Sequence, residues 1–95
     1  MRLEYPARFK RGEDGRVFVK FIDFGEPATD GANWDEAWQE AQDCLGSVIA
    51  FAIRDRRYLP SPNSLPGTVA VPVPDWISEE AVRYLTTQEV NGSAP

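Results

Sequence analysis

The chain has 95 residues, room for one sheet and two helices, and its net charge of -5 argues against a protein whose main role is to cover phosphate backbones. Histidine is absent and Cys44 is the single cysteine, so the chain lacks the usual general base, the commonest metal ligand and any internal disulfide. No apolar run approaches the roughly 20 residues of a membrane helix and no secretory signal follows Met1, so we expect a cytoplasmic protein that does not enter a membrane.

The first expected element is a β-hairpin. Apolar residues alternate with polar ones at Leu3, Tyr5, Ala7 and Phe9. This period of two is typical of a strand with one buried face. Residues 12–15 supply the glycines and the Asp-Gly pair of a tight turn, and residues 16–22 form the second predicted strand. Because Pro6 has no N–H to donate, we expect the first strand to lie at an edge or to be bulged.

A short third strand is expected at residues 28–30, followed by a long helix. Asn33 and Glu36 have the spacing of a capping box, which marks the start of the helix. Apolar residues then recur every three or four positions from Trp34 to Ile53, so one helix face should lie on the sheet. The residues expected to face away are Asp35, Glu36, Gln39, Glu40 and Asp43.

A fourth strand and a second helix complete the predicted domain. Valines alternate at residues 69–73, and Pro72 and Pro74 place this strand at an edge of the sheet. The second helix is expected to open at Ser78. We assign residues 1–86 to the domain and expect residues 87–95 to form a polar, frayed tail.

Charge is distributed unevenly along the chain. No Lys or Arg occurs between Phe21 and Ile53. The acidic residues in this stretch are Asp23, Glu26, Asp30, Asp35, Glu36, Glu40 and Asp43. The pattern fits a negative surface that docks a basic partner, and it fits a solvated helix face as well.

Catalytic chemistry finds little support in the sequence. Converging carboxylates hold the metal ions of many nucleases, but Asp23, Asp30, Glu36 and Glu40 are expected on separate elements. Cys44 falls near the apolar stripe of the long helix, where we expect a buried, inert thiol. We therefore predict no enzyme, no metal site and no cofactor.

Three segments resemble the HicB-like antitoxins, the neutralising half of a bacterial toxin–antitoxin pair. Residues 13–23 are similar to that family's Glu-Asp-Gly-Gly, followed by an apolar strand that closes on Pro-Asp. Residues 29–37 are similar to its Thr-x-Gly-x-Ser/Thr-x-x-Glu-Ala start of the long helix. Residues 59–62 and the strand at residues 69–73 follow in the same order. The resemblance covers residues 1–85.

The resemblance implies an α+β fold, a partial ribonuclease-H-like domain of order β-β-β-α-β-α, with a three- to four-stranded sheet packed on one long helix. It implies a partner as well, a small basic, mRNA-cleaving (HicA-like) toxin that the domain neutralises by occluding its surface. From charge and expected exposure, the candidate toxin contacts are Glu13, Asp14, Asp23, Phe24, Glu26 and Asp30. Reversing the charges of Asp23 and Asp30 is expected to weaken toxin binding and to leave the fold intact.

The sequence departs from the family after the strand that ends at Asp23, where Phe24-Gly25-Glu26 replaces the usual Leu-Pro-Gly. No DNA-binding module follows the second helix, which argues against DNA binding and self-repression. The alternatives are an orphan relative without a toxin, a nucleic-acid-binding domain that uses the basic first segment, and a residual metal-dependent nuclease. The apolar face of Phe18 and Ile22 and the edge strand at residues 69–73 would suit a homodimer.

Overall fold

Four strands and two helices make up the computed structural model, which describes residues 3–25, 28–63 and 65–91. In chain order the elements are β1 (Glu4–Arg11), β2 (Val17–Phe21), β3 (Ala28–Gly31), α1 (Trp34–Arg54), β4 (Val69–Pro72) and α2 (Asp75–Asn91). The strands pair antiparallel in the order β3-β2-β1-β4. The predicted α+β class and the order β-β-β-α-β-α are confirmed.

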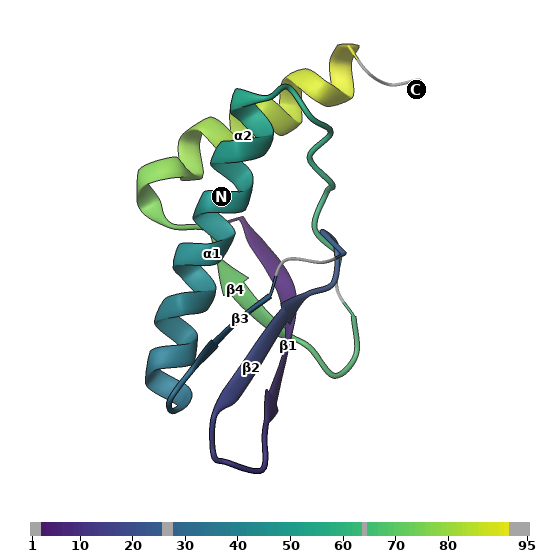
Figure 1. Cartoon of the computed structure of the whole chain (residues 1–95). Coiled ribbons are helices and arrows are strands. Elements are labelled where there is room, and N and C mark those ends of the chain that lie inside the picture. The colour runs from purple at the N-terminus through teal and green to yellow at the C-terminus, as the bar shows by residue number, and fades with distance from the viewer. Residues whose placement is uncertain (1–2, 26–27, 64, 92–95) are drawn as a thin grey trace.

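The domain has two layers, with α1 packed on one face of the sheet and α2 packed against α1 (Figure 1). A single cluster of apolar side chains fills the space between the layers. Its largest fully buried members are Tyr5, Phe21, Leu45, Ile49 and Leu59. The described residues contain no helix that is long and apolar enough to cross a membrane.

The predicted hairpin of β1 and β2 is confirmed, with paired residues running from Ala7↔Phe21 to Arg11↔Val17. The expectation that Pro6 places β1 at an edge is wrong, because β1 lies between β2 and β4. Pro6 sits where the β1–β2 pairing ends, and its carbonyl oxygen accepts a weak hydrogen bond from the Ile22 N–H at 3.4 Å. Since β2 ends at Phe21, no strand residue needs an N–H from Pro6.

The start of α1 is held by the predicted Asn33 cap, while Glu36 bonds to the N–H of Ala32 rather than to that of Asn33 as in a standard capping box. The Asn33 side-chain oxygen accepts from the Glu36 N–H, and the Glu36 carboxylate accepts from the Ala32 N–H, both at 2.9 Å. Gly31, the last residue of β3, is buried directly against this first turn. A Cβ at Gly31 would lie 2.7 Å from the Cα of Ala37, so only glycine lets β3 approach the helix this closely.

The buried stripe of α1 follows the predicted spacing, except at its first turn. Ala37, Ala41, Leu45 and Ile49 are fully buried. Trp34 is 47% exposed, because it lies over the rim of the sheet with its ring centroid 6.0 Å from that of Phe9. Cys44 was expected to be buried but is half-buried, since it sits at the border of the stripe.

A long crossing segment returns the chain from the far end of α1 to β4 (Figure 1). Hydrogen bonds tie it down at several points, including one from the Tyr84 hydroxyl to the Arg57 carbonyl at 2.7 Å. The Tyr5 hydroxyl donates to the Pro60 carbonyl at 2.7 Å, and Gln88 bonds both backbone groups of Leu59, at 2.8 and 2.6 Å. Asn63 is held by Asp23. The predicted edge position of β4 is confirmed, since β4 pairs only with β1 among the described residues.

The second helix is longer than predicted at both ends. It begins at Asp75 rather than Ser78, because the Pro74 carbonyl accepts the first helical hydrogen bonds, from Ile77 and Ser78. It continues to Asn91, past the point where the polar composition predicted fraying, and the Gln88 bonds to the crossing segment anchor its later turns. Residues 92–95 of the expected tail lie outside the described residues.

Candidate partner-binding surface

The outward side of α1 carries exposed carboxylates. The exposed polar residues along it are Asp35, Glu36, Gln39, Glu40 and Asp43. Their spacing places them together on the face turned away from the sheet. Within the part of the chain that the structure describes, Asp35, Glu40 and Asp43 form no ion pair, whereas Glu36 caps the helix. Most of this negative charge is therefore available to a partner.

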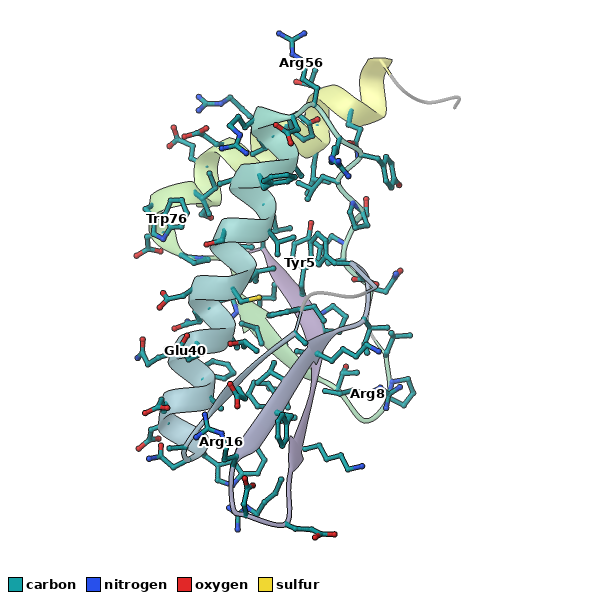
Figure 2. The ribbon with its side chains drawn as sticks, in the orientation of Figure 1. Tyr5, Arg8, Arg16, Glu40, Arg56 and Trp76 are labelled. Atoms are coloured by element: carbon teal, nitrogen blue, oxygen red, sulfur yellow. The ribbon has the colours of Figure 1, made fainter. Side chains whose placement is uncertain are left out.

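The carboxylates lead to an exposed tryptophan at the start of α2. Trp76 is 61% exposed, and its ring packs over Gly46, where a Cβ would lie 2.6 Å from the ring carbon Cζ2. A shallow groove of about 340 Å³ joins Trp76 to Asp43 and Asp75. Figure 2 shows Glu40 and Trp76 on the same side of the molecule. We call Asp35, Glu36, Glu40, Asp43, Asp75 and Trp76 the acidic face.

Three of the predicted contact residues lie near the tip of the hairpin. Glu13 and Asp14 are exposed in the turn, and Asp14 accepts a hydrogen bond from the Arg16 N–H at 3.1 Å. Asp30 accepts from Nε of Arg16 at 2.9 Å. The hydrogen bond and the charge of Asp30 raise the pKa of the Arg16 guanidinium, and part of the negative charge at the tip is compensated there.

Asp23 and Phe24 lie at the opposite end of β2, where both hold the fold together. Asp23 accepts two hydrogen bonds from Asn63. Phe24 is half-buried, with its ring centroid 4.9 Å from that of Tyr5 and 6.5 Å from that of Phe21. Reversing the charge of Asp23 would therefore break these two exposed hydrogen bonds within the domain.

The predicted contact residues do not gather into one patch. The five residues of β2, about 16 Å of extended strand, separate the hairpin tip from Asp23 and Phe24. Glu26 lies outside the described residues. Asp75 and Trp76 were not predicted from the sequence. Gly46, in the middle of the predicted helix, was a signal that a large side chain packs against the helix at that point.

The described residues hold no group of three or more Cys, Asp or Glu side chains that could bind a metal ion. Burial, and secondarily the charge of Glu40, raises the pKa of the Cys44 thiol. Because the thiolate is the nucleophile, this shift makes Cys44 less reactive than a free cysteine. The surface offers charge and shape for binding.

The sequence was compared with protein-family models and with known proteins, and both comparisons match antitoxins. The family model described as "HicB_like antitoxin of bacterial toxin-antitoxin system" matches residues 4–81, which include the whole sheet, α1 and the start of α2. Two relatives come from Photorhabdus laumondii subsp. laumondii. "Antitoxin HicB 2" is 36% identical over 91 residues, which cover 96% of this chain and 64% of the relative. "Antitoxin HicB 1" is 33% identical over 60 residues, which cover 63% of this chain and 39% of the relative.

The matched part of this chain therefore spans less than two thirds of the length of either relative. The family match nevertheless extends over most of the chain, and the order of its elements is the one that the resemblance implied. The chain belongs to the HicB-like antitoxin family.

Proposed function

We propose that this domain neutralises a small basic, mRNA-cleaving (HicA-like) toxin by covering the toxin's surface. As a member of an antitoxin family, the chain acts by binding rather than by catalysis. The observation that carries the proposal is the row of carboxylates on α1 that have no ion-pair partner within the described residues. Such a row complements a basic toxin and offers one rigid side of a helix for docking.

The acidic face also has a feature typical of binding sites. Exposed tryptophans are enriched among the residues that dominate interface energies, because one large rigid ring buries much area at little cost in side-chain entropy. In the groove beside Trp76, Asp43 and Asp75 supply acceptors for a Lys or Arg of the toxin. The complex would then combine an aromatic anchor with charged pairs at its rim.

The hairpin tip and the end of β2 are proposed as secondary contacts. Of the residues predicted there, Glu13 is exposed and has no hydrogen bond or ion pair within the described residues. Asp14, Asp23, Phe24 and Asp30 would contact the toxin while keeping their internal partners. Glu26 belongs to the same proposal from sequence alone.

The test is a binding measurement with the protein product of the open reading frame beside this chain's gene, which the proposal expects to be small and basic. We expect the double variant Glu40→Lys/Asp43→Lys to slow association with that protein by about tenfold at low salt, because complementary charges mainly raise the association rate. The difference should shrink as salt screens the charges. The comparison variant is Glu13→Lys, which reverses an exposed carboxylate at the proposed secondary contact and should slow association less than the double variant.

If the double variant associates as fast as the wild type while Glu13→Lys is slowed, the toxin docks on the hairpin rather than on the acidic face. Circular dichroism should show both variants folded, since all three carboxylates are exposed and none holds another element. Failure of the wild-type chain to bind the neighbouring protein would count against a toxin partner and favour an orphan role.

We also propose that the domain works in the cytoplasm, where mRNA is cleaved, and that it forms a homodimer through β4. Val69 on this edge strand is 45% exposed, and an edge strand can pair with a second copy of itself. Light scattering should give the mass of a dimer, and Val69→Lys should reduce it to that of a monomer. A monomeric wild type at high concentration would contradict the dimer.

A further inference from the structure

We propose that the open face of the sheet, on the side away from α1, binds single-stranded nucleic acid. Paired residues on neighbouring strands share a face, so the strand register defines what this surface presents. One row across it is Lys10, Phe18 and Asp30, and the next row is Arg8, Lys20 and Ala28. Arg8, Lys10, Phe18, Lys20 and Ala28 are all exposed, so no other described element covers these rows.

These two rows of the open face are basic although the protein as a whole is acidic, and the exposed Glu4 lies further along β1 on the same face. Arg8, Lys10 and Lys20 are exposed and form no ion pair within the described ranges. The nearest carboxylate of the two rows, that of Asp30, is already paired with Arg16 at 2.9 Å. Three cations are thus free to meet an anion on a chain whose net charge is -5.

An aromatic ring lies among these cations. Phe18, on the inner strand β2, is 47% exposed, and the edge of its ring rests on Gly12, where a Cβ would lie 2.8 Å from the ring carbon Cε2. Because Gly12 has no side chain, the Phe18 ring can lie directly against the backbone at the start of the hairpin turn. Beside it is a groove of about 540 Å³, whose lining includes Arg8, Lys20 and Gly67.

This combination matches the needs of a single strand. An aromatic side chain on an open sheet face stacks with a base, and the surrounding Lys and Arg side chains hold the phosphates. Arg8 and Lys10 are two residues apart on one strand, about 7 Å, so they would meet separate phosphates. A double helix would not expose a base to Phe18.

Charge argues against the other occupants of the open face. A second copy docked face to face would place Arg8, Lys10 and Lys20 against the same cations of its partner. A basic toxin would meet the same repulsion. The open face and the acidic face lie on opposite sides of the two layers, and Figure 2 shows Arg8 on the side away from Glu40. The inference therefore does not depend on the proposed toxin binding.

A second basic region of the chain provides a matched control. At the end of α1, the guanidinium carbons of Arg54 and Arg57 lie 4.9 and 5.5 Å from the centroid of the Phe51 ring. This aromatic ring already has two cations over it, whereas no cation–π contact to Phe18 occurs among the described residues. Nε of Arg54 lies 3.4 Å from Oδ1 of Asp55, whereas Arg57 forms no ion pair within the described residues. Charge alone would therefore let both regions attract phosphates, while stacking requires Phe18.

The experiment is fluorescence anisotropy of a labelled oligouridine RNA of about 12 nucleotides, with a matching single-stranded DNA and a duplex as further probes. We expect dissociation constants of about 10⁻⁴ to 10⁻⁶ M for both single strands, weaker binding of the duplex, and a log–log salt slope of about -2 from three cations. Phe18→Ser should weaken binding about fivefold or more without changing this slope. Lys10→Gln/Lys20→Gln should reduce the slope to about -0.7.

The control Arg54→Gln/Arg57→Gln should bind as tightly as the wild type. All the substituted side chains are exposed, so thermal melts should confirm that the variants fold. No binding by the wild type, or equal weakening by the control and the Lys10→Gln/Lys20→Gln variant, would overturn the proposal. A mass that falls from dimer to monomer in Phe18→Ser would overturn it too, since a second copy would then occupy the face.

Discussion

Asp23 at the end of β2 accepts two hydrogen bonds from Asn63, from the backbone N at 3.1 Å and from Nδ2 at 2.9 Å. These bonds join the sheet to the crossing segment across 40 positions of the chain. We expect Asp23→Ala to lower the free energy of unfolding by about 1–2 kcal/mol, because both bonds are made to a charged acceptor. Urea denaturation measures this change. An unchanged midpoint would show that the bonds contribute nothing in water.

Gly31 allows β3 to lie directly against the first turn of α1. In Gly31→Ala the new methyl group would collide with the backbone of Ala37, which cannot move without breaking the helix start. We expect a loss of about 1–3 kcal/mol in the free energy of unfolding. Gln39→Ala, an exposed change within α1, is the matched control and should leave the midpoint almost unchanged. A stable Gly31→Ala variant would mean that β3 is held less tightly than the structure shows.

Tyr5 links stability to pH at alkaline values. Its hydroxyl is buried beneath Pro60, and this burial, with the charges of Asp23 and Tyr58 as smaller causes, raises its pKa above the ordinary value of 10.0. A raised folded-state pKa contributes stability that is present below about pH 10 and is lost as the pH rises through the folded-state pKa. The wild type should thus lose stability between about pH 10 and pH 12.

The comparison variant is Tyr5→Phe, which lacks both the ionisable group and the hydrogen bond to Pro60. At pH 7 it should be less stable by about 1 kcal/mol, and the difference should narrow above about pH 10. Parallel urea titrations of the two proteins across this range would show the narrowing. A constant difference would mean that Tyr5 titrates alike in the folded and unfolded chain.

Cys44 should react slowly with thiol reagents while the domain is folded. Burial and the charge of Glu40 raise its pKa, so the thiolate fraction near pH 8 is below that of a free cysteine. We expect reaction with a disulfide reagent to be several-fold slower in buffer than in urea. Glu40→Gln removes the smaller cause and should speed the reaction of the folded protein. Equal rates in buffer and urea would contradict the shift.

Local patterns explain most of what could be predicted from the sequence. The hairpin, the Asn33 cap and the apolar stripe of α1 depend on residues within a few positions of one another, and the structure confirms all three. The central position of β1 could not be predicted from Pro6, because β4 pairs along the other side of β1 and β2 ends before it would need an N–H from Pro6. The roles of Asp23 and Gln88 depend on partners 40 and 29 positions away, which no local pattern reveals.

The exposure of Trp34 and Trp76 could not be predicted from the sequence either. Trp34 follows the helical spacing of the buried stripe, yet it is 47% exposed, with only part of its ring covered by Phe9 and Arg11. Trp76 is 61% exposed even though part of its ring rests on Gly46 of a different helix. The exposure of each tryptophan depends on contacts with a different element. The periodic pattern of a single helix contains no information about those contacts.

The two-layer arrangement has a consequence for how the molecule moves in an electric field. Carboxylates lie along the outside of α1, and uncompensated cations lie on the far side of the sheet. Charges of opposite sign on opposite sides of the two layers form a permanent dipole. A highly charged molecule approaching within about a Debye length, near 8 Å in physiological salt, would exert a torque on this dipole. The domain would therefore rotate to present one layer or the other before contact.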